Sequence, residues 1–83
     1  MKKCYYLYRA QNKDGHEYAD VTDFVAGRNL LAFLDSFRED LQIEGFELKK
    51  FVPYKSSEAA KKEADKWNDW FRQIGVYAAP YQH

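Results

Sequence analysis

The chain has 83 residues, a length that fits one domain, so we expect residues 1–83 to fold as a single unit with a small core. Thirteen bases and thirteen acids leave no net charge, which excludes a global electrostatic attraction to nucleic acid or to a membrane surface. The aromatic content is high, with seven Tyr, six Phe and two Trp, and we expect these rings to serve both the core and the surface.

The first two predicted elements form a β-hairpin. Residues 3–11 are rich in Tyr and bounded by polar residues, which favours a strand with large apolar side chains on both faces. Residues 12–15 read Asn-Lys-Asp-Gly, a sequence typical of a tight turn, because Asn and Gly tolerate positive φ. Residues 16–26 then predict the returning strand.

The most periodic stretch of the chain is residues 29–41, which predicts an amphipathic helix. Asn29 is a suitable N-cap, and Leu31 is expected to widen the buried face of the helix. Gly45 marks the end of the helix or the loop after it. The apolar face itself repeats at four-three-four spacing and consists of Leu30, Leu34, Phe37 and Leu41.

A third strand and a second helix complete the predicted elements. Residues 46–52 begin with alternating polarity, and the strand should stop at Pro53 because proline cannot donate to a β-ladder. Ser56 or Ser57 then caps the second helix, and Gly75 ends it. Residues 76–83 either dock as a short extended piece or fray. The apolar stripe of the second helix consists of Ala60, Ala64, Trp67, Phe71 and Ile74.

The resulting order, β-β-α-β-α, predicts an α+β domain with a three-stranded, largely antiparallel sheet and both helices on one face. The other sheet face would then be open to water or to a partner. Because two helices on one face cannot hide all of the rings, we expect exposed aromatic residues to form a protein-binding surface. The alternative is that the C-terminal residues 76–81 cover the excess. The candidate aromatic contacts are Tyr5, Tyr6, Tyr8, Tyr18 and Phe24.

The acidic residues are concentrated in the middle of the chain. Residues 14–47 contain nine acids and two bases, which predicts an acidic surface that can meet a basic partner. The alternative is that acidic and basic segments simply lie beside one another in the fold. The acidic candidates for protein binding are Asp20, Asp23, Asp35, Glu39 and Asp40.

No residue pattern predicts catalysis, a metal site or a cofactor. Cys4, His16 and His83 are not at metal-binding spacing. A Cys–His nucleophile would require the fold to bring Cys4 and His16 together. The four glycines are isolated, so no phosphate-binding loop is present. We therefore predict a protein that is not an enzyme.

The expected compartment is the cytoplasm. Cys4 is the single cysteine, so no internal disulfide bond can form and a reducing compartment is favoured. The N-terminal sequence lacks the apolar core of a signal peptide, and no run approaches the roughly 18 apolar residues of a membrane span.

The first functional hypothesis is a small protein-binding module, with a homodimer as its simplest form. In size, tyrosine content and lack of a catalytic motif the chain resembles short accessory proteins of bacteria, phages and mobile elements. Such a protein would inhibit a host enzyme or a nucleic-acid-guided complex by placing its acidic face on a site meant for nucleic acid. The alternative is a single-stranded nucleic-acid binder with stacking rings and basic contacts. Its candidate residues are Lys49, Lys50, Tyr54, Lys61 and Lys62.

Overall fold

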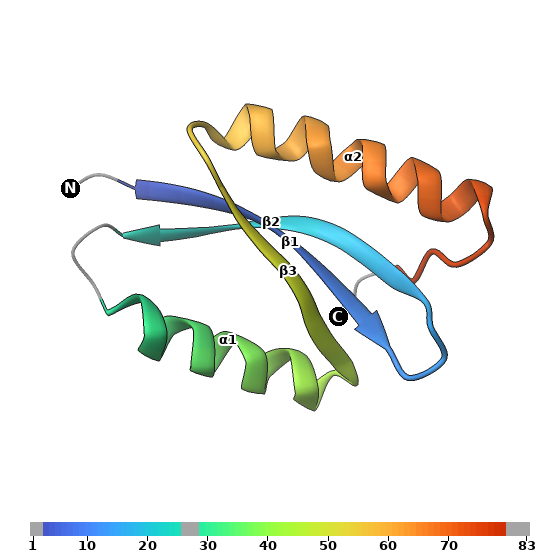
Figure 1. The fold of residues 1–83 in the computed structure, drawn as a ribbon, viewed down its shortest axis with the longest axis horizontal. Helices are drawn as coiled ribbons and strands as arrows, with labels where there is room; N and C mark the ends of the chain where they lie inside the picture. The colour runs from blue at the N-terminus through green and yellow to red at the C-terminus, as the bar shows by residue number, and fades with distance from the viewer. Residues whose placement is uncertain (1–2, 26–28, 80–83) are drawn as a thin grey trace.

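The computed structural model describes residues 3–25 and 29–79, apart from three side chains in the first two strands (Lys3, Phe24 and Val25). Its elements are β1 (Lys3–Asn12), β2 (Glu17–Val25), α1 (Leu30–Ile43), β3 (Phe46–Tyr54) and α2 (Ser57–Gln73) (Figure 1). The strands form an antiparallel sheet in the order β2-β1-β3. The predicted α+β class and the β-β-α-β-α order are therefore confirmed.

The predicted hairpin turn and helix caps are also confirmed. The Oδ1 atom of Asn12 accepts hydrogen bonds from the N–H groups of Asp14 and His16, both at 3.0 Å, and Gly15 has a φ of +85°. The side chains of Asn29 and Ser56 each accept an N–H bond from the first turn of their helix, at 3.2 Å. These contacts satisfy backbone donors that a helix start otherwise leaves without partners.

The prediction that both helices cover one face of the sheet is wrong, because α1 and α2 lie on opposite faces (Figure 1). Successive side chains of a strand point to opposite faces. Leu7 of β1 packs with Ala64 and Phe71 of α2, whereas the next residue, Tyr8, packs with Leu41 of α1. Each face of β1 carries large apolar side chains that need cover, so each helix buries its apolar stripe against a different face.

The two layers of the core differ in chemistry. Under α2, the small side chains of Ala60 and Ala64 are buried, which lets the helix approach the sheet closely. Under α1, aromatic rings contact one another edge-on or stacked, at centroid distances of 4.3 to 6.4 Å. This second layer includes three of the five rings predicted to lie on an exposed surface, those of Tyr6, Tyr8 and Tyr18. Its rings belong to Tyr6, Tyr8, Tyr18, Phe33, Phe37, Phe46 and Phe51.

The prediction that the third strand stops at Pro53 is wrong, because the strand continues through Pro53 to Tyr54. Pro53 lies opposite Tyr6 of β1, and β3 is at the edge of the sheet. An edge strand tolerates proline where its nitrogen faces away from the neighbouring strand, because no ladder hydrogen bond is lost there.

The segment after α2 docks along the start of β2. The N–H of Glu17 donates to the carbonyl of Val76 at 2.8 Å, and the N–H of Ala78 donates to the carbonyl of Glu17 at 3.0 Å. Glu17 and Tyr77 form an isolated parallel bridge. Docking of the first part of residues 76–83 is thus observed, whereas residues 80–83 lie outside the described part of the chain.

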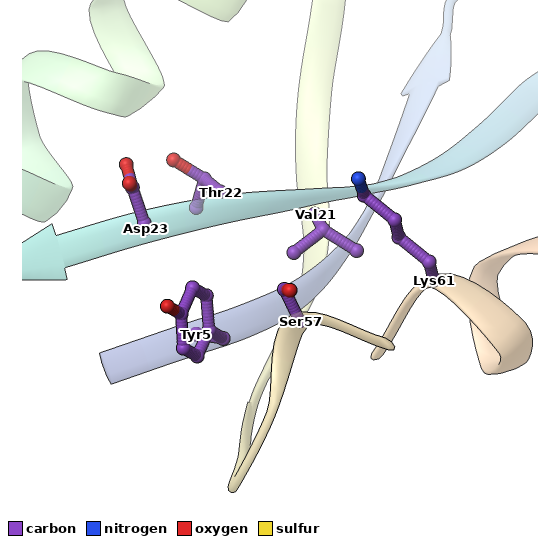
Figure 2. A pocket seen from close by; sticks show the side chains of 6 residues that line it. All are labelled: Tyr5, Val21, Thr22, Asp23, Ser57 and Lys61. Carbon is purple, nitrogen blue, oxygen red and sulfur yellow. The ribbon is translucent and has the colours of Figure 1, made fainter. Parts of the chain in front are cut away.

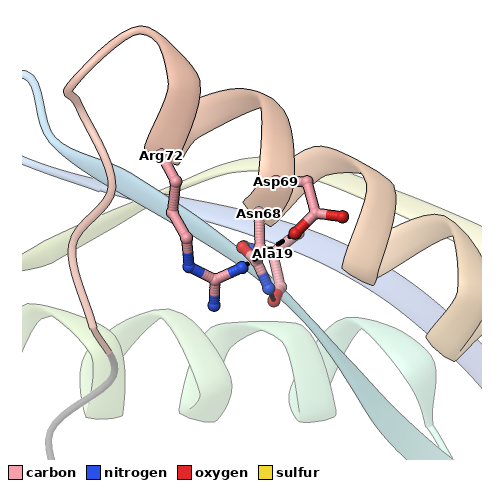
Figure 3. A network of polar contacts seen from close by, with 4 residues as sticks. All are labelled: Ala19, Asn68, Asp69 and Arg72. Atoms are coloured by element: carbon pink, nitrogen blue, oxygen red, sulfur yellow. Dashed lines mark hydrogen bonds and ion pairs between the residues drawn. The ribbon is translucent and has the colours of Figure 1, made fainter.

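A side chain of α2 extends this cover along β2. The Oδ1 atom of Asn68 accepts the N–H of Ala19 at 2.7 Å, and its Nδ2 donates to the carbonyl of Ala19 at 2.9 Å (Figure 3). The amide of Asn68 therefore replaces one residue of a neighbouring strand. Beside it, Arg72 and Asp69 form an exposed ion pair at 3.0 Å.

Candidate protein-interaction surface

Two of the aromatic residues predicted to bind a protein are in the core. Tyr8 and Tyr18 are only 8% and 3% exposed, and their rings meet edge-on at 5.9 Å. This part of the predicted surface is wrong, because α1 covers the sheet face that was expected to be open. Tyr5 and Tyr6 are half-buried, and Tyr6 stacks on a phenylalanine of β3. The side chain of Phe24 lies outside the described part of the chain.

The hydroxyl groups of the buried tyrosines indicate where nearby carboxylates lie. Burial raises the pKa of Tyr8 far above its usual range, and the neighbouring Tyr18 hydroxyl raises it further. Burial likewise raises the pKa of Tyr18. The charges of Asp20 and Glu44 act in the same direction on both pKa values. Asp20 of β2 and Glu44, the C-cap of α1, therefore lie near the same tyrosine pair.

These shifts predict that the protein loses stability at alkaline pH. A tyrosine with a folded pKa above the ordinary value of 10.0 contributes stability below about pH 10 and loses it as the pH rises further. In a spectrophotometric titration, Tyr8 and Tyr18 should ionise only as the chain unfolds. Tyr8→Phe should remove one late-ionising group. Ionisation of all seven tyrosines near pH 10 without unfolding would contradict this expectation.

The predicted acidic residues are all exposed, but they do not share one surface. Asp20 has the same strand parity as Tyr18 and lies on the α1 side of the sheet. Asp23 has the parity of Ala19 and therefore lies on the α2 side. The α1 side thus combines Asp20 with the acidic residues of α1, namely Asp35, Glu39, Asp40 and Glu44.

The charges of α1 oppose the stability of the helix itself. The helix dipole favours acids in the first turn and bases in the last turn. The first turn of α1 contains no acid and its last turn contains no base. Asp35 and Glu39 are four residues apart, as are Asp40 and Glu44, and like charges at that spacing repel each other. Within the described part of the chain, no ion pair neutralises these four carboxylates. The charge arrangement of α1 therefore does not contribute to the stability of the helix.

The same helix exposes two large aliphatic side chains. Leu31 is 73% exposed and Ile43 is 84% exposed, so the prediction that Leu31 widens the buried face is wrong. Leu41 is the one α1 residue that is fully buried. On α2, Trp70 and Ile74 are about half exposed. We define the acidic helix surface as the exposed side chains of α1 and its C-cap, namely Leu31, Ile43 and the four carboxylates.

The predicted nucleic-acid contacts come from two separate elements. Lys49 and Lys50 lie on β3, and Lys61 and Lys62 lie on α2; all four side chains are exposed. Tyr54 is half-buried and packs against the layer beneath α2, so its ring is not a free stacking platform. None of these five candidate residues therefore supplies an exposed ring on which a base could stack.

An open hollow of about 350 Å³ lies where β1 and β2 meet the start of α2 (Figure 2). Figure 2 shows Lys61 reaching from α2 toward β2 near Val21, with Ser57 at the start of the helix between Tyr5 and Lys61. The hollow contains hydroxyl groups, one carboxylate and one ammonium group, but no His or Cys, and thus no nucleophile–base pair of the Ser–His or Cys–His type. Its lining residues are Tyr5, Val21, Thr22, Asp23, Ser57 and Lys61.

The Cys–His pair considered from the sequence does not form. Cys4 lies at the start of β1, and His16 follows the turn beyond its other end, at a separation of roughly 27 Å by strand geometry. Among the residues described, no group of three or more His, Cys, Asp and Glu side chains is arranged to hold a metal ion.

The comparisons with known proteins do not identify a function for this chain. No helix within residues 3–25 and 29–79 is long and apolar enough to span a membrane. No family model, curated protein or solved structure gives a significant match to this chain.

Proposed function

We propose that the chain is a small, non-enzymatic protein-binding module that binds a basic protein surface through the acidic helix surface. The observation that carries this proposal is the exposure of Leu31 and Ile43 on a helix whose carboxylates form no ion pair within residues 3–25 and 29–79. Full burial of such an aliphatic side chain is worth about 1.5–3 kcal/mol. The two side chains supply apolar anchors, and the carboxylates select a basic partner and speed its association.

The charge of the surface defines the partner class. A basic protein surface is typical of proteins that bind nucleic acid, so occupation by α1 would compete with nucleic acid for that site. The module would then inhibit an enzyme or a nucleic-acid-guided complex, as expected for an accessory protein of a phage or mobile element. Two copies of α1 would repel each other, which disfavours a homodimer through this surface. Cys4 fits function in the reducing cytoplasm.

A pull-down with matched variants tests the proposal. Leu31→Gln with Ile43→Gln removes both apolar anchors of α1, and Trp70→Gln removes a similarly exposed apolar residue of α2. We expect the first variant to bind the captured protein at least about tenfold more weakly, which corresponds to about 1.4 kcal/mol. The second variant should bind it as the native chain does. Loss of capture only in Trp70→Gln would contradict the assignment to α1.

The same preparation tests the nucleic-acid alternative. A single-stranded binder should shift a labelled oligonucleotide at about 50 mM salt, where phosphate contacts are strong. If Lys49→Glu with Lys50→Glu abolished such a shift while the α1 variant left it unchanged, the protein-binding proposal would have to be replaced by the nucleic-acid one.

A further inference from the structure

The two edge strands of the sheet, β2 and β3, differ in whether their outward backbone groups are hydrogen-bonded. On β2, the N–H groups of Glu17, Ala19 and Val21 point away from β1 and donate outward at 2.7 to 2.8 Å. Their acceptors belong to the C-terminal segment, to Asn68 and to the neighbouring aspartate. The outward backbone groups at these three positions are therefore occupied, and a further strand cannot pair there without displacing them.

The alternation of hydrogen bonds along an antiparallel sheet defines the outward groups of β3. The backbone N–H groups of the odd-numbered residues of β2 point away from β1. The even-numbered residues of β2 therefore form the backbone hydrogen bonds with their partners on β1. The odd-numbered residues of β1, such as Leu7 and Arg9, then bond to Val52 and Lys50 of β3. The backbone groups of β3 that point away from β1 therefore belong to the residues that alternate with Lys50 and Val52, namely Phe51 and Pro53. Proline is tolerated at such a position because no N–H donation to β1 is required there.

The β3 edge is long and uncovered. It runs over nine residues, and within residues 3–25 and 29–79 no hydrogen bond of the turns, loops or side chains occupies it. Natural edge strands are protected from pairing by cover, short length, lysine, proline or bulges. The β3 edge has no cover but has the last three features, namely a register shift and the exposed side chains of Lys49, Lys50 and Pro53. Like charges on two copies repel, so these lysines oppose pairing between two β3 strands.

We propose that the β3 edge binds an extended acidic segment of a partner protein as a fourth strand. Lys49 and Lys50 are exposed on this strand and Lys55 is exposed just after it, and the one acid of the strand, Glu47, is 3.5 Å from Lys49. The outward N–H and C=O of Phe51 and the outward C=O of Pro53 can bond to a peptide backbone, and the lysines select carboxylates on that peptide. The inference rests on the strand edge alone and is independent of the acidic helix surface.

Binding of synthetic peptides tests this site. The probe is a labelled peptide of nine residues, the length of β3, that alternates Glu and Val; its counterpart alternates Lys and Val. At about 50 mM salt, fluorescence anisotropy should show at least tenfold tighter binding of the acidic peptide. Bound acidic peptide should also slow hydrogen exchange at the Phe51 N–H, because that donor becomes hydrogen-bonded.

Matched charge reversals identify the surface. Lys49→Glu with Lys50→Glu should weaken binding of the acidic peptide at least tenfold, whereas Lys61→Glu with Lys62→Glu should leave it unchanged. The Leu31→Gln and Ile43→Gln variant should bind the acidic peptide normally, which separates this site from the proposed function. Equal binding of both peptides, no binding of the acidic peptide, or binding of a single-stranded oligonucleotide only would overturn the inference. So would pairing of two copies through β3 in place of the peptide.

Discussion

Phe71→Ala is expected to lower the free energy of unfolding by about 3–5 kcal/mol. Phe71 is 2% exposed and lies in the layer beneath α2, where it packs with Leu7 and Ala64 and stacks on Trp67 at 5.8 Å. A domain of this length has a total stability of roughly 4–12 kcal/mol. Loss of this one ring should therefore remove at least about a quarter of that stability, which circular dichroism during urea unfolding will measure.

Ile74→Ala is the matched control for this prediction. Ile74 follows the last turn of α2 as its C-cap and is about half exposed, so its truncation should cost less than about 1 kcal/mol. Equal destabilisation by the two substitutions would contradict the assignment of Phe71 to the centre of the α2 layer.

The triple variant Glu39→Lys, Asp40→Lys and Glu44→Lys should bind the partner at least about 100-fold more weakly, equivalent to about 2.7 kcal/mol. The same substitutions place positive charge at the C-terminal end of α1, where the helix dipole favours it by about 0.3–1 kcal/mol per residue. We therefore expect the variant to be at least as stable as the native chain. This combination separates a functional role of the carboxylates from a structural one.

Urea unfolding and partner titration on the same preparation measure both effects. Two outcomes would contradict the account: a less stable variant, which would give the carboxylates a structural role, or a stable variant with unchanged affinity. Lys61→Glu with Lys62→Glu is the control for charge reversal on a surface that α1 does not form.

Local chemistry made much of the fold predictable from the sequence. The turn at residues 12–15 and the caps Asn29 and Ser56 follow from side chains that satisfy backbone groups next to them in sequence. The helix predicted over residues 29–41 is observed as Leu30–Ile43, because its apolar repeat identifies one buried face. These features depend on short-range geometry and need no knowledge of the sheet.

The choice of sheet face was not predictable in the same way. The periodicity of α1 and α2 defines the buried side of each helix, but not which face of the sheet it covers. The informative signal was β1, where Leu7 and Tyr8 alternate as large apolar side chains on opposite faces. Two apolar faces on a central strand require cover on both sides. Pro53 was misjudged for a related reason, since its tolerance depends on β3 being an edge.

The candidate site changed with that correction. An open aromatic face was expected, but Tyr8 and Tyr18 are buried and α1 contributes the surface instead. The acidic residues Glu39 and Asp40 were among the predicted contacts and are exposed. Leu31 was predicted to be buried because it borders the apolar stripe, but its side chain is exposed in the structure.

Site-specific photo-crosslinking in the native cell tests the central claim most directly. A photoreactive phenylalanine analogue at position 31 lies on the acidic helix surface, and the same analogue at position 62 lies on the outer side of α2. The account predicts a discrete adduct with a basic protein from position 31 and none from position 62. Equal adducts from both positions, or an adduct with nucleic acid alone, would contradict it.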